Sequence, residues 1–279
     1  MRASGKSLPA EAFSQVDAAL SYRLESAEWL PSLDLIDTLA RERPAAGAAR
    51  ERIAGGWVLY AGADSPLNHA IGMGLHGPVP AEEMDAVESF YRGHGCKVCE
   101  VVVSPYADLS LQRHLGERGY GVTEWNSVLV RGLSRTETFD TRGIDVRRVR
   151  CDEALEWSEL VARGFSDIAG VSPELFVPFA TAPNAICFIA QVDGRPAGGA
   201  GGSVFPAEGL APLYGASTLP EFRGRGVQNA LFRVRLRAAA EAGCDLAVVC
   251  AQPGSISQRN AERNGFRLAY TKAVMQRPL

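Results

Sequence analysis

The alternation of apolar and polar positions predicts a chain built from short strands and amphipathic helices. Apolar, β-compatible runs bounded by glycine, proline or aspartate predict strands over 56–61, 69–75, 98–103, 122–130, 144–149, 185–192, 196–204, 213–219, 246–251 and from 267 onward. Asp193-Gly194 stands between two of these runs and predicts the turn of a β-hairpin. The pattern therefore predicts a sheet with many short strands.

Apolar residues at helical spacing predict helices between most of these strands. The predicted helices cover 81–91, 109–117, 152–163, 172–179, 227–242 and a segment that ends at 264. The stretch 11–43 is rich in Ala, Leu and Glu and predicts two more helices, ended by Pro44. Asp152 is a good N-cap for the helix after it, and Ser172 with Pro173 opens the next one. This interleaving predicts the α/β fold class, more closely an α+β fold with a mixed sheet.

The two halves of the chain end alike. Gly265-Phe266 repeats Gly119-Tyr120, and the same spacing pairs identical residues: Gln112 with Gln258, Arg113 with Arg259, Val128 with Val274 and Arg131 with Arg277. An internal repeat of this kind indicates two related domains. The segment 132–143 between them is polar and bounded by glycine, which is typical of a linker. We therefore expect one domain over 1–131 and a second over 144–279.

Composition and charge narrow the classes of partner. The chain has 279 residues, of which 46% are hydrophobic and 22% charged, with a net charge of -3. This charge argues against nucleic acid or an anionic membrane as a partner. Apolar runs as short as 246–251 do not span a membrane, and the N-terminus lacks the apolar core of a signal peptide, so we expect a cytoplasmic protein.

Cysteine and histidine usage excludes several kinds of active site. Cys96 and Cys99 form a single CxxC that leads into a strand, so we expect buried thiols and no metal site. The four histidines all lie in the first half, which excludes a Ser-His-Asp arrangement within the second domain. No histidine begins an HxxxD pattern either.

The most informative stretch begins at Ser217 and predicts a strand, a glycine turn and a helix. Pro220 ends the strand, and Gly224 and Gly226 allow backbone conformations that are closed to other residues. The helix carries an apolar stripe, with Arg233, Arg235 and Arg237 off the stripe, and Gly243 ends it. Unpaired N–H groups at such a helix start, joined by Arg223 and Arg225, predict an anion site, most naturally for phosphate.

Three other interpretations of this turn compete. A Walker loop needs Lys followed by Ser or Thr after its second glycine, and neither is present. A dinucleotide fingerprint needs a third glycine where Asn229 stands. A turn that only connects two elements remains open on the glycine pair alone.

In its wider context the segment 144–275 resembles the GNAT acyltransferase superfamily. Of the family's R/Q-x-x-G-x-G/A motif, Arg223 and Gly226 match, whereas Gln228 departs from Gly or Ala. The resemblance implies two GNAT-like domains, each a central mixed, mostly antiparallel sheet flanked by helices. The first domain carries LHGPVPAEEM in place of the motif, with acidic Glu82 and Glu83, and is therefore expected to be a degenerate copy.

The resemblance also implies acetyl-CoA as the cosubstrate. Backbone groups of three residues would pair with the pantetheine arm: Ala216, Ser217 and Thr218. The pyrophosphate would be held by Arg223, Gly224, Arg225, Gly226, Val227, Gln228 and Asn229. Ser257 and Asn260 on the later helix would approach the far end of the arm, although helix capping and surface solvation explain either of them equally well.

The resemblance identifies no general acid. Many members of the family carry a tyrosine four residues before the Gly of Gly-Phe, where this chain has Ala261. Glu221 beside the turn and Tyr214 on the preceding strand are candidate catalytic residues, each also explained as a surface acid or a half-buried strand aromatic. The predicted activity is direct acetyl transfer, in a ternary complex, to a primary amine of a small molecule, amino acid or peptide. The alternative is a catalytically weak, CoA-binding regulatory or scaffold protein, and a homodimer is compatible with either.

Overall fold

The computed structural model describes residues 16–63, 65–165 and 172–279. These residues form two compact units that do not follow a single cut in the sequence. The first-half unit contains Val16–Val128, Ala251–Ser255 and Leu268–Leu279, and the second-half unit contains Leu129–Cys250 and Ile256–Arg267 within the described residues. The units differ from the predicted domains chiefly at the last strand, which belongs to the first-half unit.

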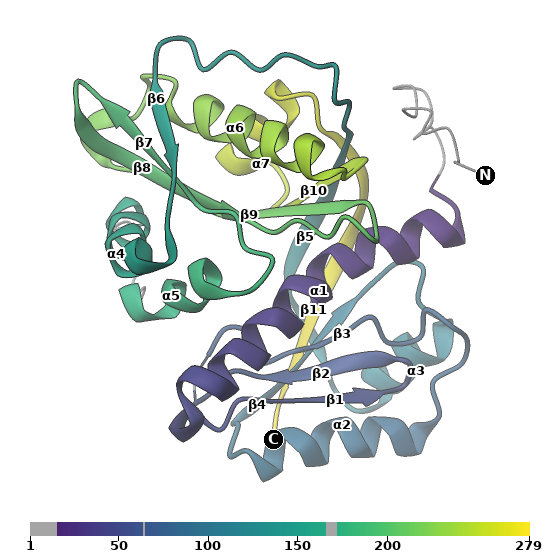
Figure 1. Ribbon diagram of the computed structural model, residues 1–279. Coiled ribbons are helices and arrows are strands. Elements are labelled where there is room, and N and C mark those ends of the chain that lie inside the picture. The colour runs from purple at the N-terminus through teal and green to yellow at the C-terminus, as the bar shows by residue number, and fades with distance from the viewer. Residues whose placement is uncertain (1–15, 64, 166–171) are drawn as a thin grey trace. The chain divides into compact units, whose positions relative to one another are not determined.

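The first-half unit is a mixed sheet with helices on both faces (Figure 1). Its strands, in the order in which they lie side by side, are β1 (Ala49–Ile53), β2 (Gly56–Tyr60), β3 (Ala70–Ile71), β4 (Val98–Val103), β11 (Arg267–Pro278) and β5 (Gly121–Gly132). Its helices are α1 (Ala18–Glu42), η2 (Pro44–Ala46), α2 (Ala81–Gly93) and α3 (Leu109–Glu117). Within this unit β3 pairs with β4 in parallel, whereas the pairs β1–β2, β2–β3 and β4–β11 are antiparallel. Val101 and Val103 of β4 join the core beneath α2 and α3.

Helix α1 covers the opposite face and differs from the prediction of two helices. It runs unbroken from Ala18 to Glu42 with Pro31 inside it, and Asp17 caps its first turn through a bond from the Leu20 amide. Pro31 is buried, and buried apolar residues continue on both sides of it. Burial of this stripe therefore outweighs the backbone hydrogen bond that proline removes.

Two further details of the first-half unit differ from the prediction. The predicted strand 69–75 is reduced to Ala70–Ile71, because Gly72 and Gly74 have φ of 76° and 72° and end the extended run. Strand β1 was not predicted, because its sequence ARERI exposes three polar side chains and has no apolar alternation. It exists through its pairing with β2.

The second-half unit contains the predicted hairpin and the predicted strand–turn–helix. Its strands, in order, are the end of β5, β10 (Leu246–Ala251), β9 (Leu210–Thr218), β8 (Arg195–Gly202), β7 (Phe188–Val192) and β6 (Asp145–Arg148). Its helices are η3 (Cys151–Glu153), α4 (Ala154–Gly164), α5 (Pro173–Thr181), η4 (Pro220–Phe222), α6 (Val227–Ala242) and α7 (Ile256–Arg263). Asp193 and Gly194 have φ of 52° and 72°, which confirms the hairpin turn between β7 and β8.

Helices α4 and α6 lie on opposite faces of β8 (Figure 1). A Cβ atom added to Gly199 would contact Val161 and Trp157 of α4, whereas one added to Gly198 would contact Val227 of α6. Successive residues of a strand face opposite sides, so the glycines bring one helix close on each face. The predicted cap at Asp152 is wrong: this residue lies in η3 and bonds Arg150, and α4 begins at Ala154. Ser172 does cap α5.

The end of β5 and nearly all of β11 lie in the unit of the other half of the sequence, an arrangement that we call the exchange of β5 and β11. Arg131, at the end of β5, donates a hydrogen bond to the carbonyl of Asn264 at 2.7 Å in the second-half unit. Arg277, at the end of β11, donates to the carbonyl of Arg118 at 3.1 Å in the first-half unit. Arg131 of the first half thus binds the residue before Gly265, and Arg277 of the second half binds the residue before Gly119. The two glycines, which begin the Gly-aromatic pairs, have φ of 82° and 77°.

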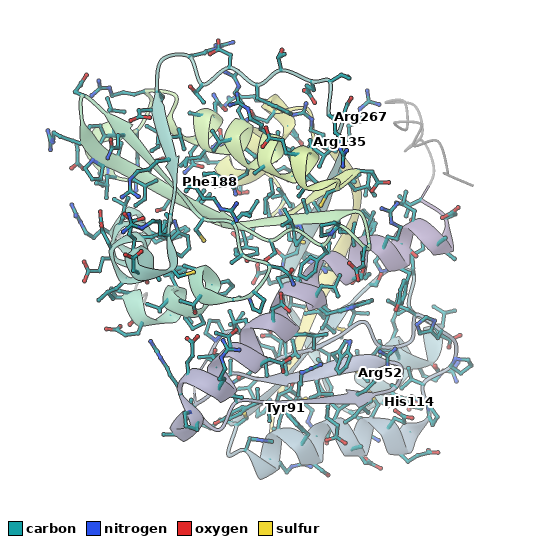
Figure 2. All side chains as sticks on the ribbon, in the orientation of Figure 1. Arg52, Tyr91, His114, Arg135, Phe188 and Arg267 are labelled. Carbon is teal, nitrogen blue, oxygen red and sulfur yellow. The ribbon has the colours of Figure 1, made fainter. Side chains whose placement is uncertain are left out.

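The segment 132–143 packs along α6 within the second-half unit. Phe139 is buried, its carbonyl accepts a hydrogen bond from Arg237, and Arg233 donates to the carbonyl of Asp140. Arg135 lies beside the C-terminal end of α6 (Figure 2), with its guanidinium 3.0 Å from the position of a Cβ on Gly243. This segment is therefore fixed by contacts with one unit. In the part of the chain that the structure describes, no helix is long and apolar enough to cross a membrane.

Candidate active site

The turn between β9 and α6 has the geometry of an anion site. Gly224 and Gly226 have φ of 76° and 87°, and Gly226 is the N-cap of α6. Its lack of a side chain leaves the first turn of α6 without a side-chain cap. A Cβ atom added to Gly224 would have nothing within 4 Å, so the backbone here is open to approach. Free N–H groups at the positive end of a helix are well suited to phosphate.

The two arginines of the turn are positioned differently. Arg223 reaches back to β9 and α4, where its Nε lies 3.4 Å from the Thr218 carbonyl and its Nη2 lies 3.3 Å from the Gly164 carbonyl. Arg225 forms an exposed ion pair with Asp193 at 2.9 Å and stacks on the ring of Phe222. Both side chains are exposed and flank the helix start, so both add positive charge there.

The side chains in the first turn of α6 have partners within the protein. Gln228 donates to the hydroxyl of Thr218 at 3.0 Å, so the residue that departs from the family motif folds back onto β9. Asn229 accepts a bond from Asn264 at 2.9 Å, and Asn264 also donates to the carbonyl of Asn260 on α7. The contribution of Gln228 and Asn229 to an anion would therefore come from their backbone amides.

Strand β9 carries a bulge just before the turn. Tyr214 pairs with Gly201 and Ser217 pairs with Gly199, so β9 contains one more residue than β8 between these pairs. Gly215 has φ of 55°, which accommodates the extra residue. On its other edge β9 pairs with β10 only from Leu210 to Pro212. The stretch after Pro212, including Ala216 to Thr218, therefore has no recorded pairing with β10.

Residues 153–266 match the sequence model of the acetyltransferase (GNAT) family. The second half of the chain is a GNAT acetyltransferase domain. A GCN5-related N-acetyltransferase from Kribbella flavida is similar in structure over 93% of this chain and 96% of its own, with a TM-score of 0.64 and 18% identity. A tandem GNAT protein from the clavulanic acid biosynthesis pathway covers 97% of both chains, with a TM-score of 0.57 and 15% identity. No curated protein sequence matches the chain.

The structural likenesses confirm the expected tandem GNAT fold over the whole chain, and the family match over residues 153–266 supports an acyltransferase. Proteins of this family use acetyl-CoA, and the open glycine turn, the uncapped start of α6 and the arginines beside it fit a pyrophosphate. Among the described residues, no group of three or more His, Cys, Asp or Glu side chains could hold a metal ion.

The end of β9 is fastened to α4. Ser217 is buried and its hydroxyl donates to the carbonyl of Val161 at 2.9 Å. A Cβ atom on Gly164 would lie 2.2 Å from the Ser217 hydroxyl, so only glycine fits at the end of α4. The predicted role of Ser217 can therefore come only from its backbone. Gly164 was not recognised in the sequence, because its need for glycine arises from a contact with a distant strand.

Tyr214 is held at the bulge by three sets of contacts. Its hydroxyl lies 2.6 Å from the Ser203 hydroxyl and donates to the carbonyl of Gly202 at 3.1 Å. Its ring packs against Phe179 with centroids 5.2 Å apart. Its carbonyl lies 3.5 Å from Nη1 of Arg235, a buried side chain of α6 that also donates to the carbonyl of Gly201 at 2.9 Å.

The remaining candidate residues are spread over the domain. Glu221 is exposed on η4, directly before the turn, and Ser257 is exposed in the first turn of α7. Asn260 lies on the same helix, where its amide oxygen accepts a bond from Arg263 at 3.3 Å. Ala261, at the position of the family tyrosine, is fully buried. The side chains of Ser257 and Asn260 have no recorded bond to the glycine turn.

The corresponding helix start in the first-half unit is unsuited to phosphate. Pro80 is the N-cap of α2, and Glu82 and Glu83 stand in the first turn. The carboxylate of Glu83 accepts a bond from the amide of Ala54. A negative charge at this position repels an anion. The two corresponding helix starts therefore differ: the start of α6 suits an anion, and the start of α2 does not.

Proposed function

We propose that the GNAT domain transfers an acetyl group from acetyl-CoA to a primary amine of a small molecule, an amino acid or a peptide. The observation that carries this proposal is the glycine turn before α6, with two positive-φ glycines and a helix start without a side-chain cap. The transfer is direct and takes place in a ternary complex: the amine nitrogen attacks the thioester carbonyl, the C–S bond breaks, the amine loses a proton and the thiolate gains one.

The chain's own residues have separate roles in this proposal. The amides of Val227, Gln228 and Asn229, with Arg223 and Arg225, hold the pyrophosphate. The backbone of Ala216, Ser217 and Thr218 pairs with the pantetheine arm, supported by the absence of recorded β10 pairing after Pro212. Ser257 and Asn260 approach the far end of the arm. Acetyl-CoA supplies the activated acyl group.

Tyr214 and Glu221 are the proposed residues for proton transfer from the amine. We assign the acyl end of the pantetheine arm to the bulge of β9, which directly precedes the segment from Ala216 to Thr218. Tyr214 lies at this bulge, and its hydroxyl is already bonded to Ser203, so it acts through water. Glu221 precedes the turn and is open to solvent. With Ala261 buried at the position of the family's tyrosine, the thiolate takes its proton from water.

The Gly224→Ala variant tests the cradle. An added Cβ has nothing within 4 Å in the free protein, so the fold should tolerate it apart from the strain of a positive φ, about 1 kcal/mol. The same Cβ would point at the bound phosphates, and we expect the affinity for acetyl-CoA in calorimetry to fall by roughly tenfold or more. Gly95→Ala is the matched control, because Gly95 has φ of 73° and an equally open Cβ position in the first-half unit.

Thiol release from acetyl-CoA over a panel of amines tests the transfer itself. Turnover that depends on Gly224 supports the proposal. The second candidate, a CoA-binding regulatory or scaffold protein, is favoured by the buried Ala261. It would be supported by tight CoA binding that is lost in Gly224→Ala without turnover of any amine. Equal acetyl-CoA affinity in Gly224→Ala and Gly95→Ala would contradict the placement of the pyrophosphate at this turn.

A further inference from the structure

Helix α5 is apolar but poorly buried. Its sequence PELFVPFAT contains one buried residue, Pro178, while Leu175, Phe176, Val177 and Phe179 are all half-buried. A single half-buried apolar residue is ordinary, but four on one two-turn helix leave a partly exposed apolar patch of the kind that a ligand or partner commonly covers.

Phe176 and Phe179 of α5 belong to a chain of aromatic rings that leads to β9. The ring of Phe176 stacks on Phe165 with centroids 5.9 Å apart, and Trp157 lies edge-on to it at 6.5 Å. Phe179 continues the chain at 6.2 Å from Phe176 and 5.2 Å from Tyr214. These five residues form the aromatic wall. Three of the rings, on Phe165, Phe176 and Phe179, are only partly buried.

The aromatic wall ends at the bulge of β9. Its last member, Tyr214, pairs with Gly201 directly before Gly215, where the extra residue of β9 begins. The glycines of β8 make this possible: a Cβ on Gly201 would lie 3.1 Å from the Tyr214 ring, and one on Gly199 would lie 2.8 Å from Val161 and 3.1 Å from Trp157. The wall therefore borders the part of β9 to which the acyl group is assigned under the proposed function.

We infer that the acceptor is an amine that carries an aryl or comparably bulky apolar group, with this group packed on Phe176 and Phe179. This inference rests on the proposed function, because it places the acceptor beside the acyl position. A protein partner fits the patch less well: a stable interface buries about 800 Å² on each side, more than a nine-residue helix presents. A small molecule with one ring matches its extent.

The test compares three amines: 2-phenylethylamine, ethylamine and 1,4-diaminobutane. We expect kcat/KM for 2-phenylethylamine to exceed the other two by roughly tenfold or more, the range that burial of an apolar group gives. Phe176→Ala should remove most of this advantage through KM, whereas Phe176→Leu should keep part of it. Leu155→Ala is the control, because Leu155 lies on α4 beside the wall's Trp157 but is 54% exposed. Calorimetric binding of 2-phenylethylamine to the CoA-saturated protein is measured in parallel.

The outcomes separate this inference from the proposed function. Binding of 2-phenylethylamine that depends on Phe176, without acetyl transfer, supports the aromatic wall as a binding site and removes the transferase proposal. Transfer to 1,4-diaminobutane or ethylamine with kcat/KM equal to that of 2-phenylethylamine overturns the inference and leaves the transferase intact. The inference is also overturned if Phe176→Ala changes neither the binding of 2-phenylethylamine nor the kcat/KM for it.

Discussion

Arg235 shows how tertiary packing can reverse the expected environment of a side chain. Its position off the apolar stripe of α6 predicts a solvated arginine, but it is 1% exposed and burial lowers its pKa to about 9. It lies over the ring of Phe232 and donates to the carbonyls of Leu231 and Gly201. Carbonyls beside a bulge lose regular strand partners, and the guanidinium replaces them.

Replacement of Arg235 by methionine should therefore destabilise the domain. We expect Arg235→Met to lower the free energy of unfolding by about 1–3 kcal/mol, because the Gly201 carbonyl is left buried without the guanidinium donor. Urea unfolding measures the change. Arg235→Lys keeps the charge but not the fork of donors and should recover only part of the loss. A methionine variant as stable as the parent would show that the free-energy cost of burying the charge equals the free energy that its hydrogen bonds contribute.

Cys187 gives a pH dependence of known sign. Burial raises the pKa of its thiol from 9.0 to about 12. Below the lower value the thiol keeps its proton in both states and contributes nothing to the pH dependence. Between the two values only the unfolded chain ionises, so stability falls as the pH rises from about 9 towards 12. Urea unfolding across this range should show a smaller decrease in Cys187→Ala. Parallel curves for the two proteins would contradict the raised pKa.

Among the elements, β5 and β11 each carry an arginine that binds a helix from the other half of the sequence. The sequence shows that Arg131 and Arg277 are repeated, but it does not show which helix each of them binds. Arg131 pairs with the carboxylate of Glu137 and also binds the backbone at the end of α7. Arg277 pairs with the carboxylate of Glu88 and also binds the backbone at the end of α3. These bonds replace partners that the last carbonyls of a helix lack.

The exchange predicts a crossed pattern of local stability. Arg277→Ala should make the amides of α3 exchange hydrogen about fivefold faster, the effect of losing roughly 1 kcal/mol, although α3 lies far from Arg277 in the sequence. Arg131→Ala should do the same to α7. Hydrogen exchange followed by mass spectrometry resolves the two helices, and each variant is the control for the other. Faster exchange confined to the helix nearest in sequence would contradict the pairing.

At the scale of the whole molecule, the residues that the structure describes form two compact units of related fold with one phosphate-type turn, before α6. The first-half unit depends on the last strand of the chain, because β11 lies between β4 and β5. Buried ion pairs join β11 to α1 there: Lys272 lies 3.4 Å from Glu25 and also pairs with Glu28, while Tyr270 donates to Glu25 at 2.6 Å. The unit therefore cannot be completed by the first half of the sequence alone.

Removal of residues 268–279 should accordingly unfold the first-half unit. Loss of β11 leaves the Glu25 carboxylate buried without its partners and exposes the edges of β4 and β5. Limited proteolysis should then cleave within 16–128 under conditions that leave the full chain intact. Leu268→Ala is the control, because this side chain is 51% exposed on the same strand. Protease resistance of 16–128 in the truncated protein would show that β11 is dispensable.

Periodicity predicted most elements because their stabilising contacts are local. The N-cap at Ser172, the hairpin at Asp193-Gly194 and the left-handed end of α6 at Gly243, with φ of 98°, were all predicted from nearby residues. The failures have the opposite cause. Strand β1 depends on its pairing with β2, and the unbroken α1 depends on burial across Pro31. Neither the strand pairing nor the burial can be predicted from the residues next to these elements in the sequence.

The sequence by itself determined the glycine turn, the helix behind it and the family, because glycine conformations, helix starts and arginine charges act over a few residues. Only the tertiary structure decided that Ser217 is buried under Gly164, that Gln228 folds back onto Thr218, and that Arg235 lies at the bulge. It also decided the exchange of β5 and β11. Each of these depends on close packing between segments far apart in the chain, and such contacts leave no local pattern to read.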